Sequence, residues 1–370
     1  MNNILIRDIQ MISLPKKAVF EVDLAGAIKS YAKKKFKPND LALTDAGKQL
    51  NQLRKECFFT TYFRPQDQID KLFIYHDQLV AFDEKIHFGD NFIKAGFKWE
   101  NAFFSCNVTL NDGFYERSCV LYYIGAFCSK VAATQQLDTE NGLKEALRLY
   151  KLAAECFLQI KNCLTFLNEM PKANDLHPKT MNVLLNLMLS QAQEVGFVKC
   201  VFDKMSNLNK SKIAAKCADY YGDTLIALNA PTVWFLKEKW SKLIKFKHLF
   251  YRAIAVYYKA LDDWDEFRIG NALARLKQSR QDLKEIDSKF RTKTMEFFLK
   301  QSKEDLEKLK KENKNFHQHE ITNVKNLELL ERFDLAKSSS VQIKFPMSKD
   351  FVSLVDKIDT NQENNNILKF

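Results

Sequence analysis

The amino-acid sequence predicts a mainly α-helical protein, a solenoid-like stack of long antiparallel helices with a small β-sheet near its N-terminus. Composition is the first reason: helix breakers are scarce, with 10 glycines and 7 prolines among 370 residues. Periodicity is the second, because apolar residues recur at helical spacing over most of the chain beyond residue 114. The third is that strand-like patterns occur only at 3–14 and 96–103.

The two strand-like stretches lie on either side of the first predicted helices. Residues 3–14 carry β-branched residues in loose alternation and end at Pro15, which predicts a short strand. Residues 96–103 lie in a region with several turn-forming glycines. Residues 20–31 begin a helix, for which Asp23 is the expected N-cap because its carboxylate accepts hydrogen bonds from the free N–H groups of a first turn.

The rest of the chain reads almost wholly as helix. An apolar stripe with charged residues on the other side predicts an amphipathic helix over 143–160. Pro178 begins the next long helix, and Pro231 opens another at a first-turn position. No linker rich in Pro, Gly or Ser divides these helices, and no repeat of about 34 residues is visible. We therefore predict one domain, residues 1–358, followed by a flexible Asn-rich tail at 359–370.

One helical stripe contains polar residues that a buried surface does not normally carry. The phrase LMLSQAQEV at 187–195 is apolar at helical spacing, so this helix is expected to bury one side. Gln191, Gln193 and Glu194 interrupt it with amide and carboxylate groups that need hydrogen-bond partners if they are buried.

Charge and cysteine content bound the kinds of partner and compartment. The formal net charge of +11 favours acidic partners, although over 370 residues it is equally compatible with solubility alone. The eight cysteines lack zinc-like spacing and mostly fall in apolar helical runs, so we expect reduced core thiols in a cytoplasmic protein. Arg7 and Asp8 interrupt the N-terminal apolar character, which argues against a signal peptide. The longest apolar run is about half a membrane span.

Residues that commonly carry catalysis or bind metals do not form a recognisable motif. There is no Gly-rich phosphate loop, no HExxH and no Cys-x-x-Cys. His317 and His319 are two residues apart, and on a helix such side chains diverge by about 200°. His76 and Asp77 are interpreted as a surface or helix-packing pair rather than a catalytic dyad. We predict no enzymatic activity, no catalytic residue, no metal and no cofactor.

The sharpest charge feature is the segment WFLKEKWSKLIKFKH at 234–248, in which five lysines alternate with aromatic and aliphatic residues. One interpretation is a core helix with a basic outer face. The other is a contact with an acidic lipid surface or an acidic protein, for which Lys237, Lys242 and Lys245 are the candidates. Nucleic-acid binding is not predicted, because no readout motif accompanies the lysines.

Three phrases in order along the chain carry a resemblance to a known family: ERSCVLYYIGAFCSKVA at 116–132, LMLSQAQEV at 187–195 and ADYYGD at 218–223. Together they resemble the Bro domain, the helical module of ALIX-like endosomal sorting adaptors. The resemblance extends from FEVDL near the start to the phrase VQIKFPMSKDFVSLVDKI at 341–358. It implies a single Bro-like domain, curved like a boomerang, with tetratricopeptide-like helix packing and a small N-terminal β-sheet.

The resemblance also implies a function. Family members act as non-enzymatic adaptors in multivesicular body formation and membrane scission, and are recruited from the cytoplasm to endosomal membranes. Their concave face binds the C-terminal amphipathic helix of an ESCRT-III filament subunit, a case of helix-in-groove recognition. Carried over by position, the residues of this site are Glu140, Lys144, Gly196, Lys199, Asn209 and Ile213.

The implied groove departs from the family pattern at two anchors. ALIX-like members have Phe at the position of Gly196 and Ile at that of Asn209, whereas Ile213 keeps a large aliphatic side chain. We therefore expect Ile213 to offer the remaining apolar surface, and Gly196 to permit close approach by a ligand or a neighbouring helix. The alternative to an ESCRT-III-binding adaptor is a protein of the same fold with a changed groove, acting on membranes or acidic proteins through its basic surface.

Overall fold

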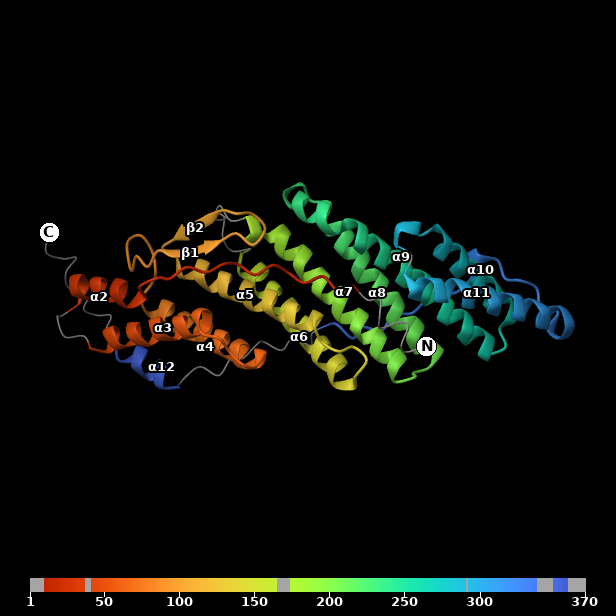
Figure 1. Ribbon diagram of the computed structural model, residues 1–370, viewed down its shortest axis with the longest axis horizontal. Helices are drawn as coiled ribbons and strands as arrows, with labels where there is room; N and C mark the ends of the chain where they lie inside the picture. The colour runs from red at the N-terminus through yellow and green to blue at the C-terminus, as the bar shows by residue number, and fades with distance from the viewer. Residues whose placement is uncertain (1–9, 37–40, 165–173, 291, 338–348, 359–370) are drawn as a thin grey trace. The chain divides into compact units, whose positions relative to one another are not determined.

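The computed structural model describes residues 10–36, 41–164, 174–290, 292–337 and 349–358, which are drawn as ribbon in Figure 1. Contacts between Cα atoms divide the chain into two compact units, each built from separate stretches. Unit 1 comprises Met1–Ser13, Ser129–Glu155 and Asn182–Ser339. Unit 2 comprises Leu14–Cys128, Cys156–Met181 and Ser340–Phe370.

The described elements are mostly helices. Those of unit 2 are α2 (Leu24–Lys35), α3 (Leu41–Phe59), α4 (Pro65–Lys85), β1 (Phe97–Glu100), β2 (Asn107–Leu110) and α12 (Lys349–Asp356). Three long helices contribute residues to both units, namely α5 (Gly113–Ala133), α6 (Glu140–Leu164) and α7 (Pro178–Phe202). Unit 1 continues with α8 (Asn207–Ala227), α9 (Trp234–Asp265), α10 (Ile269–Glu285) and α11 (Lys293–Glu312). The predicted fold class, mainly helical with one small sheet, is confirmed.

Several predicted helix boundaries are confirmed by local contacts. Asp23 is the N-cap of α2, and its carboxylate accepts a hydrogen bond from the Gly26 amide at 2.9 Å. Pro178 is the first residue of α7. Pro231 opens a short 3₁₀ turn that leads directly into α9, where a missing backbone N–H costs nothing.

The prediction of a strand at 3–14 is wrong for the part that can be compared. Residues 10–14 form no strand, and residues 1–9 lie outside the described ranges. The chain pairs with the sheet a few residues later, where Val19 bridges to Trp99 of β1. Of the apolar residues in this stretch, Ile12 and Leu14 are buried, and the backbone amide of Ile12 donates a hydrogen bond to the side chain of Gln191 in α7. The predicted strand at 96–103 corresponds to β1, which pairs antiparallel with β2.

A buried carboxylate organises the centre of unit 2. The fully buried Glu116 of α5 accepts hydrogen bonds from Arg54 of α3 at 2.9 Å and from the Tyr75 hydroxyl of α4 at 3.0 Å. Its second oxygen accepts from the Trp99 indole of β1 at 2.5 Å. Three helices and the sheet therefore meet at one charge, which three side-chain donors stabilise in place of water.

The prediction that the cysteines are reduced core residues is confirmed for six of the eight. All eight are free, and six of them are buried. Cys106 and Cys163 are exposed, so the prediction that they belong to the core is wrong. Both lie at element ends, just before β2 and near the end of α6, where helical periodicity no longer indicates which side faces the core.

Candidate functional site

The six residues of the implied partner-helix site lie on three helices of unit 1. Glu140 and Lys144 stand in the first turns of α6, Gly196 and Lys199 in the last turns of α7, and Asn209 and Ile213 in the first turns of α8. Hydrogen bonds between residues far apart in the sequence connect these ends of α7 and α8 to each other and to a later segment of the chain.

The polar members gather at one edge. Lys144 and Glu140 form an exposed ion pair of 2.6 Å, and Lys199 pairs with Asp203 one turn further along α7. The hydrogen bond and charge of Lys144 lower the pKa of Glu140, and Lys199 contributes to the same shift. All four charges therefore lie within electrostatic reach of one another at the surface.

Ile213 is not a surface residue. Its side chain is 1% exposed, so the expectation that it offers the apolar surface of a groove is wrong for this conformation. Its carbonyl accepts a hydrogen bond from the Gln193 amide of α7 at 3.2 Å, which places this turn of α8 against α7. Asn209, one turn earlier, is half-exposed, and its backbone amide donates to the capping hydroxyl of Ser206 at 3.3 Å. An aspartate at position 213 would therefore test folding rather than binding.

Gly196 is covered by a distant part of the same chain. Residues 318–337, here called the strap, follow the π turn after α11 and run back along α10, α8 and α7, with one 3₁₀ turn at Val324–Asn326; they are shown in blue in Figure 1. A Cβ atom at Gly196 would lie 2.8 Å from Cδ1 of Leu335 in the strap. Gly196 does permit a close approach, as expected, but the segment that approaches it is the strap, through Leu335, and not a ligand or a helix.

Gln193 holds the strap in this position. Its side-chain amide donates to the Phe333 carbonyl at 2.8 Å, and its side-chain oxygen accepts from the amides of Leu335 and Ala336 at 2.9 and 3.1 Å. The Gln193 side chain, which was expected to need hydrogen-bond partners, is fully buried, and its partners include backbone groups about 140 residues further along the chain.

The other two polar residues of that phrase are also satisfied. Gln191 binds both backbone groups of Ile12, at 2.5 Å to the amide and 3.0 Å to the carbonyl. Glu194 accepts hydrogen bonds from Lys247 at 2.7 and 2.9 Å and from the hydroxyls of Tyr221 and Tyr251. Burial, with the charge of Glu194 added, raises the pKa of both tyrosines well above the usual range, so both hydroxyls remain donors.

Ion pairs join the strap to the outer side of α8. Glu331 pairs with Lys212 at 2.5 Å, and Arg332 pairs with Asp219 at 3.0 Å. Asp334 accepts a hydrogen bond from the Tyr220 hydroxyl at 2.6 Å. The charges beside Leu335 are therefore largely matched within the chain.

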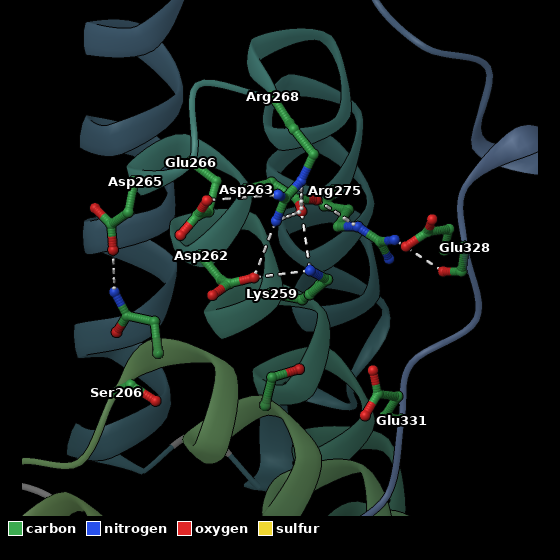
Figure 2. Close-up of polar contacts among 12 residues, drawn as sticks. Ser206, Lys259, Asp262, Asp263, Asp265, Glu266, Arg268, Arg275, Glu328 and Glu331 are labelled. Carbon is green, nitrogen blue, oxygen red and sulfur yellow. Dashed lines mark hydrogen bonds and ion pairs between the residues drawn. The ribbon is translucent and has the colours of Figure 1, made fainter.

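The beginning of the strap uses a second helix glycine. A Cβ atom at Gly270 of α10 would lie only 2.2 Å from the Glu320 carbonyl oxygen, so the strap backbone requires glycine there. Figure 2 shows the polar cluster next to it, in which Arg275 donates to the buried carboxylate of Asp263 at 2.9 Å and to the Glu328 carbonyl at 2.8 Å. Because Asp263 also binds Arg268 and Lys259, the α9–α10 turn and the strap share one network.

The basic segment divides into exposed and buried lysines. Lys237, Lys242 and Lys245 are exposed on α9, as a basic outer face requires. Lys247, counted with them in the sequence, is only 4% exposed and belongs to the Glu194 network, so its assignment to that face is wrong. Two large apolar side chains are exposed in this part of the chain, Trp234 at the start of α9 at 55% and Ile226 in the last turn of α8 at 71%.

The histidines that the sequence analysis considered, His317, His319 and His76, do not gather with other metal-binding side chains in the described part of the chain. His317 ends a π turn after α11 and His319 lies beyond it, with ring centroids 6.0 Å apart, so they do not share a helix as assumed. The Nδ1 atom of the His76 ring lies 3.6 Å from the Oδ1 atom of the Asp77 carboxylate. Among the residues that the structure describes, no group of His, Cys, Asp and Glu side chains is placed to hold a metal ion. No helix in the described ranges is long and apolar enough to cross a membrane.

Comparison with known proteins gives one consistent picture. The profile of the BRO1-like domain matches residues 11–364. Programmed cell death 6-interacting protein of Homo sapiens is 29% identical over 359 residues, which is 94% of this chain and 41% of that protein. Vacuolar protein-sorting protein bro-1 of Neurospora crassa is 29% identical over 267 residues, covering 72% of this chain and 26% of that protein. The chain thus spans less than half the length of these relatives.

Solved structures agree with the sequence comparison. The complex of the ALIX BRO1 domain with CHMP4C is similar with a TM-score of 0.82 at 28% identity, covering 92% of this chain and 99% of that one. ALIX in complex with the SIVmac239 PYKEVTEDL late domain gives a TM-score of 0.80 at 28% identity, covering 92% of this chain and 50% of that one. A Bro1 domain studied for endosomal targeting, 19% identical over 96% of this chain and 97% of that one, agrees in fold with a TM-score of 0.74.

Proposed function

The chain belongs to the BRO1-like domain family, and from this premise we propose that it is an adaptor that binds the C-terminal amphipathic helix of an ESCRT-III subunit during endosomal sorting. The observation that carries the proposal is the likeness to the ALIX BRO1 domain in its complex with CHMP4C, which extends over 92% of this chain. The vacuolar-sorting relatives support a role at endosomal membranes. We propose this adaptor role in place of enzymatic activity, and recruitment from the cytoplasm to those membranes.

The proposed site keeps the predicted residues in two different roles. Glu140, Lys144, Lys199 and Asn209 are exposed or half-exposed, so their polar groups are accessible to a ligand. Gly196 and Ile213 are buried and act beneath the surface, where they set the positions of the strap and of α8.

The direct test is a titration of the protein with a fluorescent peptide that contains the C-terminal helix of CHMP4C, followed by fluorescence anisotropy. We expect saturable binding with a dissociation constant below about 1 mM, the limit at which the binding free energy is about 4 kcal/mol. The matched control is a peptide of the same composition whose apolar residues are spread around the helix. Equal signals from the two peptides would show that no amphipathic groove is present.

A second candidate function is favoured by the exposed basic face of α9. Lys237, Lys242 and Lys245 lie on the same helix as Trp234, and tryptophan is enriched at membrane interfaces. Each lysine near an anionic membrane contributes about 1 kcal/mol, so three of them are expected to give measurable attraction.

Flotation with phosphatidylserine liposomes tests this surface. Replacing the three lysines by glutamate should abolish co-flotation and leave the melting midpoint nearly unchanged, because the side chains are exposed. A control variant replaces Lys303, Lys310 and Lys311, exposed lysines of α11, by glutamate. If both variants lose flotation equally, the net charge of the protein rather than this face of α9 is responsible. Liposome binding that does not weaken as the salt concentration rises would contradict an electrostatic contact.

A further inference from the structure

We propose that a cavity between α4, α5 and the end of α6 binds a small neutral molecule, in which an apolar ring or chain carries one carboxamide group. The residues that line this cavity belong to unit 2, whereas the six residues of the partner-helix site belong to unit 1. Such a ligand site is independent of the proposed ESCRT-III adaptor role and adds a second binding activity to it.

The size and the walls of the cavity suit a ligand smaller than a drug. Its volume is about 200 Å³, whereas pockets for drug-sized molecules hold roughly 300–1,000 Å³. The apolar walls are the side chains of Val80 from α4, Phe114 and Leu121 from α5, and Ile160 from α6. A single aromatic or aliphatic ring with one substituent therefore matches the space and its lining.

Two buried polar atoms define the group that the ligand carries. Arg117 and Gln159 both line the cavity. Among the residues that the structure describes, neither Nε of Arg117 nor Oε1 of Gln159 has a hydrogen-bond partner, although both atoms are buried. Buried polar atoms are normally satisfied by a protein group, by water or by a ligand, because leaving them unpaired costs free energy. Nε–H is a donor and Oε1 an acceptor, and a carboxamide serves both, since its oxygen accepts and its N–H donates.

The charge of Arg117 is already matched within the chain, which favours a neutral ligand over a carboxylate. A terminal nitrogen of its guanidinium lies 3.5 Å from Oδ2 of Asp83, and its guanidinium carbon lies 5.7 Å from the centre of the Phe114 ring. Burial already raises the pKa of Asp83, so a second anion next to it would be disfavoured. A carboxylate would also bring no N–H group for Gln159.

Two cysteines make it possible to locate a bound ligand. Cys163 is a free, exposed thiol that lines the cavity, so it lies at the mouth. Cys106 is the other exposed thiol, just before β2 and outside the cavity lining. A molecule in the cavity should therefore shield Cys163 from a thiol reagent and leave Cys106 as reactive as before.

The test begins with titration of the full chain by benzamide, followed by saturation-transfer NMR of the ligand. Two molecules of nearly the same shape are the comparison: acetophenone has a methyl group in place of the amide nitrogen, and benzoate carries a negative charge. We expect saturable binding of benzamide with a dissociation constant on the order of 1 mM, as for a small ligand of this size. Acetophenone and benzoate should bind about threefold more weakly or worse, because each lacks the N–H donor.

Thiol modification then places the ligand. The protein is treated with methyl methanethiosulfonate, with and without saturating benzamide, and the modified peptides are quantified by mass spectrometry. We expect benzamide to slow the modification of Cys163 several-fold and to leave that of Cys106 unchanged. If Cys163 is not slowed, or if both thiols are slowed equally, benzamide does not occupy this cavity and the inference is overturned.

Three variants test the assignment of the residues. Gln159→Leu should weaken benzamide binding about threefold and leave acetophenone binding unchanged, so that the two molecules bind alike. The matched control is Gln66→Leu, at an exposed glutamine of α4, which should preserve the difference between them. Val80→Phe should remove the binding of both molecules, because the larger side chain fills the cavity from a half-buried position. The melting midpoint of each variant shows whether it is folded.

Several results would contradict the inference. Equal affinities of wild-type protein for benzamide and acetophenone would show that the amide N–H is not recognised. Tighter binding of benzoate would make the cavity a site for anions, and no saturable binding of benzamide would exclude the carboxamide class. A preference for benzamide that persists in folded Gln159→Leu protein would assign the recognition to another residue, and the inference would again be wrong.

Discussion

Replacing Lys247 by alanine is expected to lower the free energy of unfolding by about 3–5 kcal/mol, a large fraction of the stability of an ordinary domain. The reason is the carboxylate left behind. Glu194 is 2% exposed and receives Lys247 at 2.7 and 2.9 Å, so without the ammonium it becomes an unpaired charge out of contact with water. Urea denaturation followed by circular dichroism measures the change.

Two further variants isolate this cause. Lys245→Ala removes an exposed lysine from the same helix and should change stability by no more than about 0.5 kcal/mol. The double variant Glu194→Gln with Lys247→Met removes both charges while Gln still accepts from Tyr221 and Tyr251, and should recover part of the loss. If Lys247→Ala is no worse than Lys245→Ala, the buried pair does not stabilise unit 1.

The second large effect is expected from Glu116→Ala in unit 2. It leaves the buried Arg54 guanidinium without its counter-charge, and it removes the acceptor of the Tyr75 hydroxyl and of the Trp99 indole. Breaking a buried ion pair from one side costs about 3–5 kcal/mol, and each unsatisfied buried donor adds about 1–3 kcal/mol. We expect a loss of at least about 4 kcal/mol, measured by denaturant unfolding with the change in tryptophan fluorescence as the signal.

The control for this prediction is an exposed glutamate of the same unit. Glu84→Ala in α4 removes a carboxylate of equal charge from the surface and should be nearly neutral. Glu116→Gln should fall between the two, because an amide oxygen still accepts hydrogen bonds but offers Arg54 no charge. A Glu116→Ala variant as stable as Glu84→Ala would mean that water or another carboxylate replaces Glu116.

The structural features that were predicted correctly from the sequence are those determined by residues close together along the chain. The N-cap at Asp23 and the start of α7 at Pro178 follow from contacts or constraints within one helical turn. The strand expected at 3–14 failed because alternation does not reveal whether a side chain from elsewhere takes the backbone hydrogen bonds, as Gln191 does at Ile12.

The candidate site was harder to predict, since its decisive contacts join distant residues. An aliphatic residue in an amphipathic helix reads alike whether it faces the core or a ligand, which is why Ile213 was assigned to a surface. Gln193 was correctly marked as needing partners, but nothing near it in the chain points to residues 333–336. Leu335 itself carries no motif, and only the fold shows that it packs on Gly196.

The bond between Gln193 and the strap also orders events during synthesis. The partners of this side chain in the strap lie 140 to 143 residues further along the chain, so at ribosomal speed they emerge on the order of ten seconds after α7. Until then α7 and α8 are complete, yet the Gln193 side chain has only the Ile213 carbonyl as a partner, and Gly196 is not covered by Leu335. A nascent chain in that interval is therefore expected to be a substrate for chaperones, and arrest of translation before residue 333 should prolong their association, whereas arrest after residue 337 has left the ribosome should release it.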